Sequence, residues 1–366
     1  MGEGGVPGVE DVARLGRWLA SSGITSGDAP PSVQLIGGGR SNLTYLLDVR
    51  AGPAPGRGRL VLRRPPLGHV LPTAHDMARE FRVLTALNGT AVPVPRPVAL
   101  CDDPSIVGAP FYLMDYMDGS VLRTRQDAGL LTPAQAGLLS QRFVEMLATI
   151  HGLDVEAVGL GGFGKPEGYL VRQFARWQRQ WELSATREMP GYEELTRRLE
   201  AGLPAVSGAA VPGDGGTLVH GDYRIDNMLV IPGGEPRISA VVDWEMSTLG
   251  DPLADLGLTL IYWADPADPQ WLDISIGAAV TAMPGFFTRT ELAARYAELT
   301  GRDLSRIGYY MAFGCFKLAV VLEGIHARFL QHKTVGEGFE REGHAVPVLI
   351  GRAHQMLDGV LSGDIK

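Results

Sequence analysis

The spacing of hydrophobic and polar positions changes character once along the chain. Up to about residue 116, short runs of strand-forming residues alternate with loops and Gly- or Pro-rich turns. The expected strands lie at 33–36, 43–49, 60–63, 97–100 and 110–116. Helical spacing predicts helices at 8–21 and 74–88. These segments together predict a small, mostly antiparallel sheet with one helix inserted between its strands.

After Gly119 the pattern is mainly helical. Thr132, Pro133 and Gln135 form a strong helix start, with an N-cap hydroxyl, Pro at the first helical position and Gln closing a capping box. The expected helices lie at about 132–151, 169–188, 191–203, 252–264, 289–300, 304–331 and 340–360. One β island interrupts them, with strands expected at 218–219, 228–231 and 238–242. The pattern therefore predicts an α+β protein with a β-rich N-terminal part and a mainly helical C-terminal part.

Composition narrows the class of protein. A chain of 366 residues corresponds to about two compact units, and 45% hydrophobic against 20% charged residues provides for a sizeable core. The net charge of −8 argues against nucleic acid as the main partner. Neither oligomeric state nor acceptor charge follows from these numbers.

Cysteine usage and apolar runs indicate a cytoplasmic protein. Cys101 and Cys315 are too far apart in sequence for metal-ligand spacing and too few for a disulfide framework. The N-terminus lacks the pattern of a secretory signal. The longest apolar runs, such as 256–264 and 318–322, are too short to span a bilayer, so no membrane association is expected.

The β island carries the residues with catalytic chemistry. Asp222 follows His220-Gly221, Asn227 comes five residues later, and Asp243 ends the next hairpin strand before Trp244-Glu245. Phosphoryl transfer needs a carboxylate that accepts the proton of the attacking hydroxyl and oxygen ligands that hold Mg²⁺ against the phosphates. Residues of these types on one loop and one hairpin can supply both.

This compound motif resembles that of the aminoglycoside phosphotransferase-like family of small-molecule kinases, which includes choline, homoserine and fructosamine kinases. The resemblance covers about residues 30–330 and implies a bilobed, protein-kinase-like fold. It implies that Asp222 is the catalytic base and that Asn227 and Asp243 bind Mg²⁺, with Glu245 as a weaker candidate close to the metal.

The N-terminal part also resembles this family. Gly37, Gly38 and Gly39, followed by Ser41 and Asn42, form a Gly-rich turn between two strands, where backbone N–H groups can approach phosphate oxygens. The segment from Met114 through Asp115 to Met117 ends the last strand and resembles the hinge that hydrogen-bonds adenine. The resemblance thus implies a nucleotide site that includes Gly38, Gly39, Ser41, Asn42, Asp115 and Met117.

The third strand departs from the commoner pattern. It reads Leu60-Val61-Leu62-Arg63, and residues 1–117 contain no Lys that could take the usual phosphate-binding role. Because side chains alternate along a strand, we expect Arg63 to face the same side as Val61. Arg is a legitimate phosphate ligand, and the resemblance implies that Arg63 would pair with Glu80 on the following helix, as the usual Lys pairs with a helix Glu. In having Arg at this strand, the chain resembles a subgroup of kinase-like domains that are attached to acyl-CoA dehydrogenases.

Three further features have structural interpretations. Asp251-Pro252 is expected to start a helix in which Asp255 braces the catalytic loop, as the family's DxxxD motif implies. His151 follows an apolar helix face and is expected to be a buried structural histidine. Arg172, Arg176 and Arg179 share one face of a helix, which is either a solvated surface or an anion-attracting wall of the acceptor pocket.

The sequence therefore predicts an ATP- or GTP-dependent, Mg²⁺-requiring kinase of a small-molecule hydroxyl group. Its N-terminal lobe, residues 1–117, would bind the nucleotide, and residues 118–366 would form the catalytic and substrate-binding lobe. Two alternatives remain open: a catalytically silent nucleotide-binding module, which the missing Lys suggests, and an antibiotic-resistance aminoglycoside kinase. A third class, the protein kinases, is disfavoured because 244–251 leads almost directly into a helix. The acceptor is expected to be a neutral or anionic hydroxylated metabolite, and hydroxyacyl thioesters are one candidate class.

Overall fold

The computed structural model describes residues 6–38, 42–49, 58–67, 76–207, 216–266, 268, 280–331 and 342–359. The chain divides into two compact units, Met1–Asp118 with Ser239–Glu245, and Gly119–Ile238 with Met246–Lys366. Ser239–Glu245, which we expected in the C-terminal lobe, thus groups with the N-terminal segment. The functional division into nucleotide-binding and substrate-binding lobes stays a prediction.

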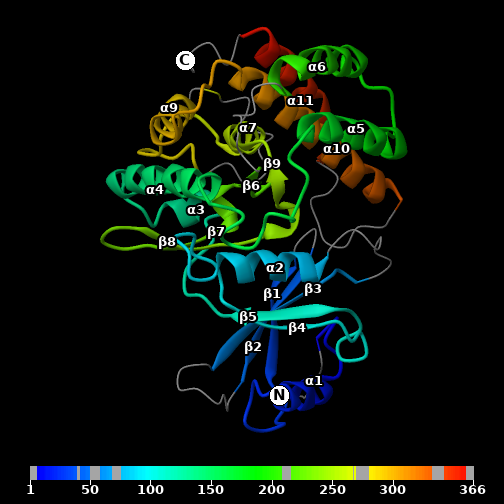
Figure 1. The fold of residues 1–366 in the computed structure, drawn as a ribbon, viewed down its shortest axis with the longest axis vertical. Helices are drawn as coiled ribbons and strands as arrows, with labels where there is room; N and C mark the ends of the chain where they lie inside the picture. Colours follow the sequence, from blue (N-terminus) through cyan, green and yellow to red (C-terminus); the bar gives the residue numbers. More distant parts are fainter. Residues whose placement is uncertain are drawn as a thin grey trace. The chain divides into compact units, whose positions relative to one another are not determined.

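The first unit is built on one five-stranded sheet with the order β1-β2-β3-β5-β4, in which every neighbouring pair is antiparallel (Figure 1). The strands are β1 (Ser32–Gly38), β2 (Leu43–Asp48), β3 (Arg59–Arg64), β4 (Pro97–Cys101) and β5 (Phe111–Asp115). This sheet confirms the predicted β-rich N-terminal part.

Successive side chains of β3 point to opposite faces of the sheet. Leu60 and Leu62 are buried in a cluster that includes Leu15 and Leu19 of helix α1 (Val12–Ser21). Arg63 points instead toward helix α2 (Met77–Leu87), where it contacts Glu80. Because side chains alternate between the faces of a strand, one face of β3 builds the core and the other presents a charged group.

The second unit is mainly helical, as predicted. Its helices are α3 (Arg125–Ala128), α4 (Pro133–His151), α5 (Tyr169–Ser184), α6 (Tyr192–Ser207), α7 (Pro252–Tyr262), α9 (Arg289–Thr300), α10 (Ile307–Leu330) and α11 (Glu342–Leu357). The expected capping box is present, since the Thr132 side chain accepts from the Gln135 N–H and the Gln135 side chain accepts from the Thr132 N–H.

Helix α10 is the core helix of this unit, with α5, α6, α7 and α11 packed against it (Figure 1). In the described residues it alone is long and apolar enough, by length and composition, to cross a membrane. However, 83% of its apolar window is buried inside the protein, as expected for a central core helix.

The β island contains one strand that the sequence pattern did not predict. Strands β7 (Met228–Ile231) and β8 (Arg237–Val241) form the expected two-stranded sheet. Strand β6 (Thr217–Val219) pairs in antiparallel fashion with β9 (Thr248–Gly250), which we did not expect. The loop after β6 and the start of α7 after β9 are therefore held next to each other.

Candidate active site

The loop that follows β6 is fixed by one buried carboxylate. Asp255, in the first turn of α7, accepts hydrogen bonds from the backbone N–H groups of His220 (2.7 Å) and Gly221 (2.9 Å). Its Oδ2 also lies 3.2 Å from Nε2 of His151, whose Nδ1 lies 2.7 Å from the Tyr296 hydroxyl. The expected bracing role of Asp255 and the buried, structural position of His151 are confirmed.

The charge of Asp255 is stabilised by these contacts. Burial by itself would raise its pKa, but the hydrogen bond and charge of His151, together with His220, outweigh burial and hold the pKa below its usual value. A buried carboxylate that accepts two backbone N–H groups is thus kept ionised and can orient the loop.

Gly221 is required by the shape of this loop. Its φ is 81°, and a Cβ at this position would lie 2.5 Å from the backbone oxygen of Met246. Only glycine combines a left-handed conformation with such a close approach. The next residue after this tight turn, Asp222, is half-buried.

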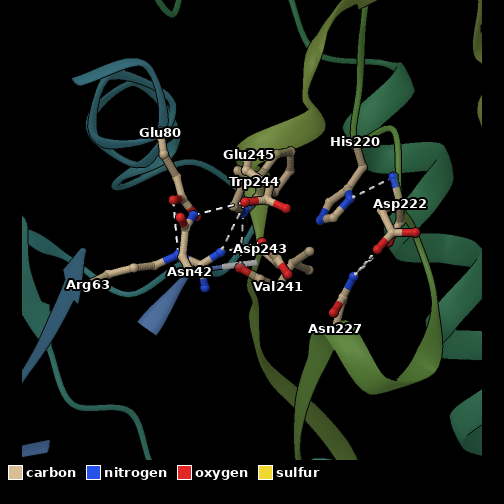
Figure 2. Close-up of polar contacts among 10 residues, drawn as sticks. All are labelled: Asn42, Arg63, Glu80, His220, Asp222, Asn227, Val241, Asp243, Trp244 and Glu245. Atoms are coloured by element: carbon tan, nitrogen blue, oxygen red, sulfur yellow. Dashed lines mark hydrogen bonds and ion pairs between the residues drawn. The ribbon is translucent and has the colours of Figure 1, made fainter. Parts of the chain in front are cut away.

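Asp222 and Asn227 point toward one another (Figure 2). Asn227, at the end of a short 3₁₀ helix η1 (Ile225–Asn227), donates from Nδ2 to the backbone oxygen of Asp222 (2.8 Å) and to its Oδ2 (3.1 Å). The Asp222 N–H in turn lies 3.3 Å from Nδ1 of His220. The structure therefore brings two of the predicted functional residues into contact through the amide nitrogen of Asn227.

Tyr262, at the end of α7, completes the surroundings of Asp222. Burial and the negative charge of Asp222, to which its hydroxyl is hydrogen-bonded, raise the pKa of Tyr262 well above its usual value. The guanidinium of Arg224 lies 4.8 Å from the centre of the Tyr262 ring. Sequence reasoning missed Tyr262, because an apolar helix end shows no sign of a polar contact 40 residues back along the chain.

In the first unit, Arg63 gathers three carboxylates (Figure 2). Its Nε donates to Glu80 Oε2 at 3.0 Å, its Nη2 donates to Asp243 Oδ1, and Glu245 Oε2 lies 3.9 Å from Nη2. The predicted pairing of Arg63 with Glu80 is confirmed. The contact with Asp243, 180 residues further along the chain, was not predicted.

The burial of this cluster shifts its ionisation. Burial raises the pKa of Glu80 above its usual value, and Arg63 only partly counteracts this effect. Burial would also lower the pKa of Arg63, but Glu80 and Asp243 outweigh it and keep the guanidinium charged. Arg63 is therefore a permanent cation surrounded by acids.

Asp243 itself adopts an unusual backbone conformation. Its φ is 67°, the only positive φ at a non-Gly residue in the described segments. Asp tolerates this region better than most residues, yet such conformations are costly and concentrate at functional sites. The following turn, η2 (Trp244–Met246), buries Trp244, whose Nε1 donates to the Val241 backbone oxygen at 3.0 Å.

Asn42, which directly follows the undescribed part of the Gly-rich turn, joins the same cluster. Its Nδ2 donates to Glu245 Oε2 at 2.8 Å, while its buried Oδ1 has no hydrogen-bond partner in the described residues. Gly38 ends β1 opposite Leu43, whereas Gly39 and Ser41 lie outside the described residues.

The expected adenine hinge is more constrained than the sequence suggested. Asp115 accepts two hydrogen bonds from Arg96 (2.7 and 3.1 Å), and its backbone N–H donates to the Arg96 carbonyl. Met117 lies two residues beyond the end of β5 and is half-buried. The contact of these residues with adenine stays a prediction.

The three arginines on α5 are exposed, and they differ in their contacts. Arg172 donates to the backbone carbonyls of Lys165 and Glu167, so its guanidinium is occupied. Arg176 lies 5.2 Å from the centre of the Trp177 ring. The exposed positions fit a solvated surface, and an acceptor-binding role stays a prediction.

Comparison with known proteins shows which family the chain resembles. A model of the phosphotransferase enzyme family matches residues 32–292. Acyl-CoA dehydrogenase family member 11 of Rattus norvegicus is 35% identical over 302 residues, which cover 82% of this chain but 37% of that protein. The chain thus spans little more than a third of the length of this relative.

Solved structures show the same fold. The crystal structure of a putative aminoglycoside phosphotransferase from Ralstonia eutropha is 31% identical and superposes with a TM-score of 0.73, covering 95% of this chain and 98% of the other. A thermostable mutant of aminoglycoside phosphotransferase APH(4)-Ia, solved with AMP-PNP and hygromycin B, is 16% identical with a TM-score of 0.56, covering 94% and 97%. The second likeness concerns the fold alone.

Proposed function

Because the chain belongs to the phosphotransferase enzyme family and has its protein-kinase-like fold, we propose that it transfers the γ-phosphoryl group of ATP to a hydroxyl of a small molecule. GTP is the alternative donor. The observation that carries the proposal is the loop geometry: a buried Asp255 fixes the backbone before Asp222, and Asn227 orients the Asp222 carboxylate.

Asp222 is the proposed catalytic base. It would accept the proton of the acceptor hydroxyl while the acceptor oxygen bonds to the γ-phosphorus and the bond to the β–γ bridging oxygen breaks, releasing ADP. The hydrogen bonds from Asn227 and Tyr262 hold the Asp222 carboxylate in one orientation. This arrangement suits general-base catalysis, which requires a positioned carboxylate.

Asn227 and Asp243 are the proposed Mg²⁺ ligands, and their chemistry fits the ion. Both present hard oxygen donors, and Mg²⁺ commonly uses one or two protein ligands together with substrate phosphates and water. When bound, Mg²⁺ would neutralise charge on the phosphates.

Arg63 is proposed to take the role that Lys has in many family members. It is fixed by Glu80 and Asp243, and it stays charged in a largely buried position. A guanidinium offers several donors in a fixed geometry, so it can retain Glu80 and still donate to a phosphate. This arrangement supports an active enzyme over a catalytically silent module, whose main support was the missing Lys.

The acceptor is proposed to be a neutral or anionic hydroxylated metabolite rather than a polycationic aminoglycoside. The exposed arginines of α5 support this choice, because they would repel a polycation. The name of the rat relative adds hydroxyacyl thioesters to the compounds worth testing.

A panel assay tests the proposal. Purified protein with Mg·ATP is given hydroxyacyl thioesters, free hydroxy acids, sugars and kanamycin-type aminoglycosides, and ADP release is measured. Acceptor-dependent ADP release with an anionic or neutral compound supports the proposal. Efficient phosphorylation of aminoglycosides alone would instead favour the antibiotic-resistance alternative.

A further inference from the structure

Lys317 brings an ammonium group from the core helix to the loop that carries Asp222. It lies in the middle of α10, and its Nζ donates a hydrogen bond to the Gly221 carbonyl at 2.7 Å. Its charge also interacts with those of Asp222 and Asp255. Nothing in the motif around Asp222 points to a residue 95 positions later.

The peptide unit before Asp222 is thereby held at both of its polar atoms. Lys317 binds its carbonyl oxygen, and the His220 ring lies 3.3 Å from its N–H nitrogen. The two preceding N–H groups are already bound to Asp255. Because Gly221 has no side chain and a φ of 81°, these polar contacts are what restrains the turn.

The position of Lys317 is costly for a lysine. The side chain is half-buried in a mainly apolar helix, with Nζ 5.6 Å from the centre of the Trp177 ring. Burial lowers the pKa of Lys317, and Arg176 adds to this effect, whereas Asp222 and Asp255 favour the charged form. Among the described residues it forms no ion pair at contact distance, so the Gly221 carbonyl is its one direct polar contact there.

An ammonium that is partly removed from water and has no contacting carboxylate stabilises a fold poorly. An apolar side chain of similar length would suit a core helix better at this position. A cation at this position, in contact with the Gly221 carbonyl, therefore points to a role in the loop.

We propose that Lys317 is a positioning residue for Asp222, anchoring the Gly221 carbonyl so that the carboxylate is presented to the acceptor hydroxyl. The proposal rests on the proposed function of Asp222. It assigns to α10 a share in the reaction beyond its role as the core helix.

The test separates loop position from chemistry. Lys317→Met keeps the length of the side chain and removes the donor, Lys317→Arg keeps the donor and charge, and Lys165→Met is the matched control at an exposed lysine. Hydrogen exchange of a peptide covering residues 217–228 reports the loop, and ADP release with Mg·ATP alone, water acting as acceptor, reports the chemistry. Melting temperatures identify any variant that fails to fold.

We expect faster exchange of the loop in Lys317→Met. Its kcat should fall roughly 10- to 100-fold, as for a small misplacement of a catalytic group, with little change in the KM for ATP. Lys317→Arg should restore most of the loop protection and rate, and Lys165→Met should match the wild type. Recovery in the Arg variant distinguishes anchoring from a general loss of packing.

The positioning role of Lys317 and the catalytic role of Asp222 can be rejected independently of each other. Unchanged loop exchange and kcat in Lys317→Met, with an inactive Asp222→Asn variant alongside, would reject the role of Lys317 alone. A fully active Asp222→Asn variant would reject the catalytic assignment of Asp222, whatever Lys317 does to the loop.

Discussion

Asp255 shows how a single residue fixes the candidate site. Its carboxylate joins α7 to the backbone N–H groups of His220 and Gly221 and to the His151 ring. Asp255, His151 and His220 are all buried, and polar groups in such positions need hydrogen-bond partners. The position of Asp222 is therefore linked to the stability of the second unit.

Replacing Asp255 should lower both stability and activity. Asp255→Asn keeps the shape but can accept from only one of the two N–H groups, and we expect a loss of about 2–4 kcal/mol in the free energy of unfolding. Urea denaturation at pH 7 measures it. The same change at exposed Asp118 is the control, and equal stability of the two variants would contradict the bracing role.

The lowered pKa of Asp255 adds a dependence on pH. A carboxyl with a folded-state pKa below its unfolded value stabilises the protein above the unfolded pKa, and this stability is lost as pH falls through the folded pKa. Denaturation series from pH 7 to acid should therefore show a shallower acid decline in Asp255→Asn than in the wild type. Parallel curves would show that Asp255 contributes nothing to the decline.

Gly221 allows a test with a closely matched control. Gly221→Ala places a methyl group 2.5 Å from the Met246 carbonyl at a φ of 81°, whereas Gly159→Ala has a φ of 80° and open space around it. Backbone strain alone costs of order 1–3 kcal/mol in both variants. We expect Gly221→Ala to be less stable than Gly159→Ala and to lose activity in addition. Equal melting temperatures and rates would contradict the close approach.

Some contacts of strand β3 could be predicted from its sequence, and others could not. Simple alternation predicts that Arg63 and Val61 share a face, and the resemblance to the kinase pattern implies that Glu80 on the next helix is the partner of Arg63. The contact with Asp243 could not be predicted, because it depends on the return of Ser239–Glu245 to the first unit. Strand β9 was missed for a related reason: three residues are too short to show a period.

Variants of Arg63 test the arrangement on this strand. Arg63→Lys should retain measurable phosphotransfer, because it keeps a cation near Glu80 and Asp243. Arg63→Met should abolish it and cost about 3–5 kcal/mol, since buried carboxylates lose their partner. ADP release and urea denaturation measure the two effects. Wild-type activity in Arg63→Met would reject a role for Arg63 at the phosphates.

At the scale of the whole molecule, the proposed groups are distributed over both units. Arg63, Glu80 and Asp243 belong to the first, and Asp222 and Asn227 to the second. The sequence motif supplied the chemistry of these residues, because their types and spacing resemble the family pattern. The motif did not indicate Lys317 or Tyr262, because these residues contact the loop around Asp222 only through the packing of α10 and α7.

The first unit's share in metal binding can be measured by itself. Asp243→Asn removes one charge and preserves shape, so calorimetry should show markedly weaker binding of Mg·ATP. Binding of ATP without Mg²⁺ should change less, which separates metal binding from disturbance of Arg63. Asp118→Asn in the same unit is the control. Equal Mg·ATP affinities would remove Asp243 from the metal site.

The rate of ADP release by Asp222→Asn tests the central claim most directly. General-base catalysis contributes about 10²- to 10⁴-fold, so we expect turnover to fall by at least roughly 10²-fold. Mg·ATP affinity should persist, because Asn227 and Asp243 are intact, and the melting temperature should barely move, because Asp222 is only half-buried. Wild-type turnover in this variant would contradict the assignment of Asp222 as the catalytic base of a phosphotransferase.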